Sequence, residues 1–368
     1  MKTLNLVARI VVGLTFVFSG TVKAIDPLGS AYKFNDYFHA FNLGFLTSLA
    51  LPLAIFLCTA EFIAGFCVLT GVMKKAGIKL VLLLMIIFTP LTLVLAIFNP
   101  VSDCGCFGDA IKMTNWQTFL KNIVLLLFTI ILVLNLRKNK DNAIGNHDIK
   151  IVVVVSVLFV LFSIYNLIYL PVIDFLPYKE GVRIADKMKI PEGAEPDKYE
   201  TTFIYEKNGT RKEFDINNYP ADDTSWKFVD QKSILVSKGY QPPIHDFSIT
   251  NSKGEDITDS ILTNKGSTVL MIVKKFADAR EKHLVDGFDF GRTCLNNGID
   301  FYVLTASGLD EATSYDNTIK FCNADETTLK TIVRSNPGYM LIENGIIRRK
   351  WSWAEKRENA MTLSLNRK

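Results

Sequence analysis

The chain has 368 residues, a net charge of +4 and 49% hydrophobic residues, which leaves room for two or three domains. The apolar residues gather in the first 175 residues, so a membrane half precedes a water-soluble half. The basic residues cluster beside apolar segments and form no aromatic-interleaved patch, which gives no support to nucleic-acid binding. Six cysteines are too few and too scattered for the disulfide framework of a small secreted protein.

Five segments are long and apolar enough to cross a lipid bilayer, which needs about 20 such residues in a helix. They are predicted at residues 4–24, 45–73, 80–102, 114–136 and 151–173. The second carries one acid, Glu61, and the third carries Pro90, where we expect a kink. We expect the first segment to be retained, because it lacks a small-residue cleavage site and further spans follow it.

The loops between these spans differ in charge. Basic residues lie after the second and the fourth span, at Lys74, Lys75, Lys79, Arg137, Lys138, Lys140 and Lys150. The loops after the first and the third span hold only Lys33 and Lys112 as bases. The positive-inside rule therefore places the amino terminus and the basic loops in the cytoplasm of a bacterium. Residues 25–44, 100–113 and everything after about 175 are then expected on the periplasmic side of the inner membrane.

The loop after the third span contains Cys104-Gly105-Cys106. Two thiols one residue apart can close a strained disulfide, and the glycine between them gives the backbone the freedom to do so. A strained disulfide is easily reduced, so the spacing favours redox exchange. Asp103 and Asp109 flank the pair, and their negative charge is expected to raise the pKa of its thiols.

Other interpretations of the pair stay open at this point. It could be a structural disulfide that tightens the loop, or two free thiols without a role. It could also be half of a metal site, but no second Cys/His pair lies at ligand spacing, and His39 and His245 are isolated. No metal is therefore expected.

Several motifs resemble the DoxX and MauE membrane proteins. They are Arg9 to Gly13, Phe18 to Lys23 with Asp26-Pro27, Glu61 to Gly65, Leu69 to Gly71, and the string DCGCFGD at 103–109. The resemblance covers about residues 4–136 and implies a four-helix unit in which Cys104 and Cys106 exchange electrons. It also implies a likeness to quinone-linked thiol oxidases, so a quinone is a candidate cofactor. Those oxidases use a pair spaced by two residues and a second pair, which this chain lacks.

Glu61 is the ionisable residue that the second span must accommodate. An acid in the membrane is costly unless it is paired or lines a polar cavity, so a proton relay or a headgroup contact is one interpretation. A buried hydrogen bond between helices is the other. We expect Glu61 to lie beyond mid-membrane, out of contact with the cysteines, and Cys58 and Cys67 to be packing residues.

The water-soluble half begins with a linker that carries a β-hairpin. Strands are predicted at 198–207 and 210–216, joined by Asn208-Gly209. Strands then alternate with helices in an α+β order. The strands are expected at 246–249, 267–273, 299–305, 338–342 and 346–351, and the helices at 280–297, 309–319 and 327–334, the last capped by Asp325.

This order resembles a thioredoxin-like domain over about residues 243–353. Asn336-Pro337-Gly338 matches the position of its cis-proline, and Gly345 matches the turn of its last hairpin. The chain departs from active members at 274–280, where no Cys-x-x-Cys opens the helix. Cys294 and Cys322 are expected to be packing residues. The resemblance therefore implies a docking surface at Asn336 and Pro337 and no thiol chemistry in this domain.

The predicted organisation has four parts. A four-helix membrane domain (1–140) resembles DoxX and MauE, and a cytoplasmic loop with a fifth span (141–176) follows it. A periplasmic linker with a hairpin (177–242) leads to a degenerate thioredoxin-like domain (243–368). The combination resembles an arrangement found in membrane proteins of Bacteroidota.

Three functions are compatible with this organisation. The favoured one is thiol–disulfide exchange between Cys104 and Cys106 and a periplasmic thiol protein. The alternative is a non-enzymatic membrane scaffold whose thioredoxin-like domain docks partners. A solute transporter is a third, weakened because five spans show no internal repeat.

Overall fold

The computed structural model describes residues 2–101, 103–138, 145–195, 198–207, 209–216, 218–220, 223–237, 239–313, 315–316 and 318–355. The predicted loop base Lys140 and the predicted turn residue Asn208 lie outside these ranges, as do residues 356–368 of the predicted last domain. The chain divides into two compact units, Met1–Gly181 with Ser248–Lys368, and Val182–Phe247.

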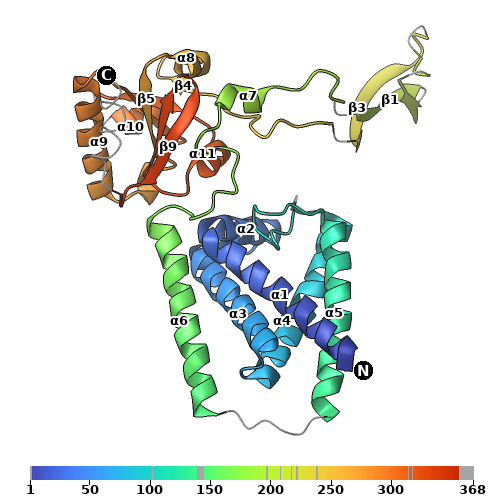
Figure 1. Cartoon of the computed structure of the whole chain (residues 1–368). Helices are drawn as coiled ribbons and strands as arrows, with labels where there is room; N and C mark the ends of the chain where they lie inside the picture. Colours follow the sequence, from blue (N-terminus) through green and yellow to red (C-terminus); the bar gives the residue numbers. More distant parts are fainter. Residues whose placement is uncertain are drawn as a thin grey trace. The chain divides into compact units, whose positions relative to one another are not determined.

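Within the described ranges, five helical segments are long and apolar enough to cross a membrane, which confirms the five predicted spans. They are α1 (Lys2–Ile25), α3 (Ala50–Thr70) with the preceding 3-10 turn η1 (Gly44–Leu49), α4 (Lys74–Phe98), α5 (Asn115–Lys138) and α6 (Asn146–Ile168). Figure 1 shows α1, α3, α4 and α5 gathered into a bundle. The chain is a multi-pass membrane protein.

Two of the predicted spans, 80–102 and 151–173, were wrong at both ends, because the helices begin at Lys74 and Asn146 and end at Phe98 and Ile168. α4 begins at Lys74 and ends at Phe98, short of the predicted 102, because Asn99 adopts the left-handed conformation with φ 47° and Pro100 follows it. α6 ends at Ile168, short of the predicted 173, and Pro171 follows. Both predictions followed the apolar run, which continues past the last helical turn.

Small residues set the distance between α1 and α3. A Cβ atom at Gly20 would lie 2.6 Å from the Cys58 carbonyl oxygen, and one at Gly65 would lie 2.6 Å from the backbone nitrogen of Val17. The two helices therefore approach so closely that only glycine fits at these positions, as is common between membrane helices.

A helix that was not predicted, α2 (Pro27–Ala40), follows α1. The Asp26 carboxylate accepts a hydrogen bond from the Gly29 amide, and Pro27 occupies the first turn, so an N-cap and a favourable first residue start the helix. Figure 1 shows α2 lying across one end of α1 and α3. This helix brings Lys33 and Tyr37 to the segment between α4 and α5.

The last part of the chain, residues 248–355, is called the sheet domain below. Its strands are β4 (Thr250–Asn251), β5 (Ser267–Val273), β6 (Asp300–Thr305), β7 (Lys320–Asn323), β8 (Gly338–Glu343) and β9 (Ile346–Ser352), in the order β4-β7-β6-β5-β8-β9. The neighbours β5, β6 and β7 are parallel, whereas β8 and β9 join antiparallel. Its helices are α8 (Thr258–Thr263), η2 (Phe276–Asp278), α9 (Glu281–Asn296), α10 (Leu309–Thr313) and α11 (Glu326–Ile332).

This mixed sheet with its helices confirms the predicted thioredoxin-like architecture. The Asn336–Pro337 peptide bond is cis and Gly345 has φ 72°, as the resemblance implied, and Asp325 caps α11. Cys294 and Cys322 are fully buried. The predicted strand 246–249 was wrong, because the pairing segment is the two-residue β4, and the helix predicted at 309–319 ends at Thr313.

The unit Val182–Phe247 holds a short helix, α7 (Ile184–Met188), and a three-stranded antiparallel sheet. Its strands are β1 (Lys198–Lys207), β2 (Thr210–Asp215) and β3 (Lys227–Ser237), in the order β2-β1-β3. The pairing of Lys207 with Thr210 confirms the predicted hairpin. The third strand was not predicted, since the residues before it lack a tight-turn signal.

Candidate functional site

The segment 103–109, called the cysteine loop below, brings the two thiols of the pair together. The Sγ atoms of Cys104 and Cys106 lie 2.8 Å apart, so a disulfide needs only a small shift of the side chains. Gly105 between them has φ 62°, a conformation that residues with a Cβ rarely adopt. The loop is therefore built to hold two reactive sulfurs side by side.

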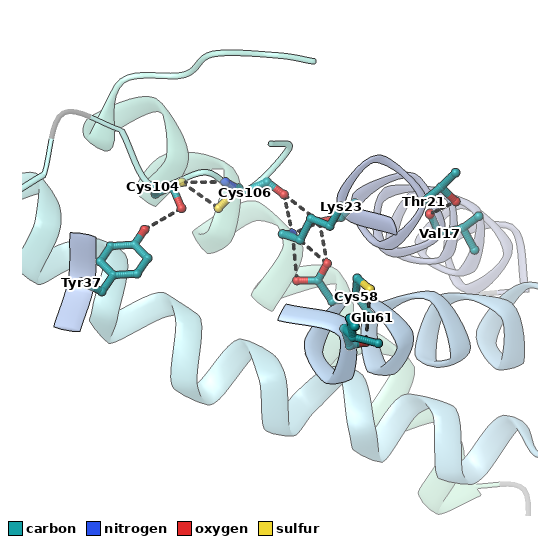
Figure 2. Close-up of polar contacts among 10 residues, drawn as sticks. Val17, Thr21, Lys23, Tyr37, Cys58, Glu61, Cys104 and Cys106 are labelled. Atoms are coloured by element: carbon teal, nitrogen blue, oxygen red, sulfur yellow. Dashed lines mark hydrogen bonds and ion pairs between the residues drawn. The ribbon is translucent and has the colours of Figure 1, made fainter. Parts of the chain in front are cut away.

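Helices of the bundle hold this loop by its backbone and by Asp103. The Tyr37 hydroxyl donates to the Cys104 carbonyl at 2.5 Å. Lys33 donates to the Asp103 carboxylate at 2.9 Å. From α1, the Lys23 ammonium donates to the Cys106 carbonyl at 2.6 Å. Figure 2 shows Tyr37 and Lys23 reaching the loop from two sides.

Glu61 is linked to the cysteine loop through two side chains of α1, Lys23 and Ser19. Its carboxylate pairs with Lys23 at 2.8 Å, and both side chains are buried. The Ser19 hydroxyl lies 2.8 Å from both the Glu61 carboxylate and the Cys106 carbonyl. A continuous polar chain therefore joins Glu61 to the cysteine loop (Figure 2). A buried charge requires such a partner.

The two thiols differ in acidity. A hydrogen bond from the Cys106 thiol stabilises the Cys104 thiolate, with help from the Thr118 hydroxyl at 3.3 Å and from Lys121, and lowers the pKa of Cys104 to about 6 although burial opposes this. The pKa of Cys106 is raised well above its ordinary value, because its proton is shared with Cys104 and because it is more deeply buried. Cys104 is therefore the more acidic thiol of the pair.

The flanking aspartates do not make Cys104 a weak acid, contrary to the expectation from sequence. Asp103 pairs with Lys33 at 2.9 Å, and Asp109 pairs with Arg334 of the sheet domain at 2.7 Å. Each negative charge has a cation beside it, so its effect on the thiol is offset.

A cavity of about 130 Å³ extends from the two sulfurs into the bundle. Its polar lining includes Ser19, Lys23, Tyr37 and Glu61, which bond to the loop or to one another, together with Ser30, Lys121 and Asn122. Apolar side chains line the rest, among them Phe16, Leu57, Met85, Phe88, Leu91, Leu95 and Leu125. The buried Ser30 hydroxyl finds no hydrogen-bond partner among the described residues. The cavity therefore suits a small molecule with polar groups at one end and an apolar body.

Asn336 and Pro337, where a docking surface is expected, lie on the sheet domain after α11. The Asn336 side chain accepts from the Lys274 amide at 3.0 Å and so holds the start of the segment in which thioredoxins carry cysteines. Cys58 and Cys67 are buried in α3. Within the described ranges, no three His, Cys, Asp or Glu side chains gather as a metal site would require.

Several residues of the site escaped sequence reasoning. Lys23, Lys33, Tyr37, Lys121 and Arg334 contribute to it from four different elements. Lys23 and Lys121 offered a signal, because each is a basic residue inside a predicted apolar span. The others depend on α2 and on the placement of the sheet domain, which no local pattern encodes.

Comparisons with known proteins agree with this architecture. Residues 1–135 match the family model described as Methylamine utilisation protein MauE. Residues 199–238 match one described as a domain of unknown function, DUF8463. No curated protein matches the chain.

Among solved structures, the chain is similar to the solution structure of a proposed protein disulfide isomerase from Bacteroides thetaiotaomicron. The match has 18% sequence identity and a TM-score of 0.26, and covers 33% of this chain and 84% of that one. The chain joins a region similar to the MauE family, over residues 1–135, to the mixed-sheet domain described above.

Proposed function

We propose that this chain is a membrane thiol–disulfide redox protein in which Cys104 and Cys106 exchange electrons with the thiols of a partner protein. The observation that carries the proposal is the pair itself: a stabilised Cys104 thiolate lies 2.8 Å from a second sulfur, at the mouth of a cavity. A structural disulfide would not need a cavity beneath it. The MauE-like region and the thioredoxin-like domain support a redox role at the membrane in general, without specifying the reaction.

The partner is a periplasmic protein, in our proposal. The start of α4 carries Lys74, Lys75 and Lys79, and positive charge marks the cytoplasmic ends of spans. The cysteine loop follows at the other end of α4, and is therefore assigned to the periplasmic side of the inner membrane. Thiols can be oxidised there and remain so.

Exchange proceeds through a mixed disulfide on Cys104, the more accessible and more acidic thiol. The Cys104 thiolate attacks a partner disulfide, a new S–S bond forms, and one partner thiolate leaves. Cys106 then gives up its proton and attacks the Cys104 sulfur. The intramolecular disulfide forms and the partner leaves as a dithiol. The same steps in reverse oxidise a partner dithiol and leave the pair reduced.

The cavity fits a lipid-soluble quinone as the second electron carrier. The unpaired Ser30 hydroxyl, Lys121 and Asn122 would hold its polar ring, and the apolar end of the cavity would hold its tail. When bound, a quinone would accept two electrons and two protons as the dithiol closes to a disulfide. Glu61, Lys23 and Ser19 are assigned to proton transfer beside the cavity, because they form a polar chain to the loop.

Trapping of the mixed disulfide tests this function. In Cys106→Ala no thiol remains to release a partner from Cys104, so a mixed disulfide should accumulate in acid-quenched cells. The matched control is Cys104→Ala, which should accumulate little, because the pKa of Cys106 is raised well above its ordinary value. If neither variant traps a partner while both remain in the membrane, the redox function is wrong and the scaffold function is favoured.

A further inference from the structure

One of the side chains that bond to the cysteine loop belongs to the sheet domain. Lys33 and Tyr37 of α2 and Lys23 of α1 hold the first part of the loop. Its last residue, Asp109, is held at 2.7 Å by Arg334, which lies between α11 and β8 of the sheet domain, 225 residues further along the chain. The sheet domain therefore completes the support of the loop.

Arg334 joins the loop to α2 as well. Its side chain is only 6% exposed and its Nε donates to the Asp26 carboxylate at 2.8 Å. Asp26 is the N-cap of α2 and also accepts from the Gly29 amide at 2.8 Å. One guanidinium thus neutralises two carboxylates, at the start of α2 and at the end of the cysteine loop, with the fork geometry that lysine cannot reproduce.

The surface around Arg334 contacts Tyr32, an aromatic residue of α2. The Tyr32 hydroxyl accepts a hydrogen bond from the buried Lys274 ammonium at 3.2 Å. The Lys330 ammonium and the Arg334 guanidinium lie over the Tyr32 ring, 5.0 Å and 5.4 Å from its centroid. Such cation–π contacts favour an electron-rich ring beside clustered cations.

The contact with Tyr32 lies next to the cis-proline peptide of the sheet domain. Lys274 opens the segment that carries cysteines in active thioredoxins, and Asn336 of the cis-proline peptide holds its amide. The edge at which a thioredoxin-like domain is expected to bind another protein therefore already has an occupant, which is α2 of the same chain.

We propose that the cis-proline edge of the sheet domain is an intramolecular clasp on α2 and the cysteine loop, with Arg334 as a positioning residue for the Cys104–Cys106 pair. The inference rests on the proposed thiol function for its consequence, though the clasp itself does not. The stabilisation of the Cys104 thiolate requires the Cys106 thiol and Thr118 at their present distances. Loss of the Arg334 contact leaves Asp109, at the end of the loop that follows Cys106, free to move. The distances from Cys104 to Cys106 and to Thr118 are then less well fixed.

The test compares Arg334→Gln with Arg334→Lys and with Arg348→Gln in the full chain, reduced and in mild detergent. Arg348 is a matched control, because it is half-exposed and pairs with Glu343 inside the sheet domain. The readout is the pH dependence of Cys104 alkylation, followed by mass spectrometry. Charged or titratable groups that face Cys104 in every variant are Asp103, Cys106, Lys121, Lys33 and Tyr37.

We expect Arg334→Gln to raise the pH midpoint of Cys104 alkylation by about one pH unit. This shift lowers the rate of Cys104 alkylation at pH 6 about fivefold. Arg334→Lys should restore part of the rate, and Arg348→Gln should match the unaltered chain. A midpoint unchanged in Arg334→Gln, with the fold retained, would overturn the positioning role.

A second readout keeps the clasp separate from the thiol function. Hydrogen exchange of the α2 amides, in a Cys104→Ser/Cys106→Ser background, should become faster in Arg334→Gln and not in Arg348→Gln. Unchanged exchange would overturn the clasp. If the unaltered pair instead titrates like ordinary thiols and traps no partner, the proposed function fails, while faster α2 exchange in Arg334→Gln still supports the clasp.

Discussion

At the scale of single residues, the two thiols of the cysteine loop have unequal environments. Cys104 receives hydrogen bonds that stabilise its thiolate, whereas Cys106 is buried and keeps its proton. An asymmetric pair separates the attacking sulfur from the resolving one, which is what exchange through a mixed disulfide requires.

Alkylation of the reduced protein measures this asymmetry. Because the thiolate is the nucleophile, the rate at Cys104 should rise with pH through a midpoint near 6 and fall as the pH drops below it. Cys106→Ala removes the stabilising hydrogen bond, so the midpoint should move up toward the ordinary thiol value of about 8.5. Cys106→Ser keeps a donor and should give a midpoint between the two. Equal midpoints in all three proteins would contradict the assigned cause.

The buried pair of Lys23 and Glu61 gives a second prediction at this scale. Lys23→Met leaves a buried carboxylate without its partner and should destabilise the protein by about 3 kcal/mol, measured by thermal unfolding in detergent. Lys33→Met is the control, because the Lys33–Asp103 pair is about a quarter exposed and its loss should cost less than about 1 kcal/mol. Adding Glu61→Gln to Lys23→Met should recover part of the loss. A Lys23→Met variant as stable as Lys33→Met would contradict the charged pair.

The sequence predicted part of this site. The spacing of Cys104 and Cys106 predicted two thiols close enough to form a disulfide, and their sulfur atoms lie 2.8 Å apart. The acid at Glu61 indicated a functional or paired group. The partner of Glu61 could not be predicted, because Lys23 lies 38 residues away and only the close approach of α1 and α3 brings them together. The prediction that the flanking aspartates raise the pKa of the thiols was wrong for a similar reason. The cations that pair with these aspartates come from α2 and from the sheet domain.

At the scale of elements, the site depends on how closely α1 and α3 pack and on where α2 lies. The apolar runs predicted the spans but not their last turns, where Asn99 and Pro171 matter more than hydrophobicity. α2 was not predicted from the sequence, because its residues are too polar and too few for a span. Asp26-Pro27 is nevertheless a helix-start signal.

Gly20→Ala tests the helix packing. The added methyl group would meet the backbone of α3 at 2.6 Å and 2.7 Å, so the helices must separate, at a cost of about 2 kcal/mol or more. Because Lys23 and Glu61 lie on these two helices, their contact should weaken and Cys104 alkylation should change with it. Gly44→Ala is the control, since nothing lies within 4 Å of that position. Equal thermal stability of the two variants would contradict the close approach.

At the scale of the whole molecule, a MauE-like membrane region and the sheet domain are joined in one chain. The pair Cys104–Cys106 lies in the first, and the cysteines of the sheet domain are buried in its core. The domain order was predictable from hydropathy and from the alternation of strands and helices. The contact of Arg334 with Asp26 and Asp109 was not, because it joins residues 308 and 225 positions apart.

The redox state of Cys104 and Cys106 in intact cells tests the central claim most directly. Cells are quenched with acid and treated with a maleimide that adds mass to free thiols, in a chain whose other four cysteines are replaced by alanine or serine. The account predicts that dithiol and disulfide forms coexist, that the dithiol accumulates when the quinone supply is depleted, and that an added thiol oxidant reverses this. A pair held in one state under all these conditions would contradict it.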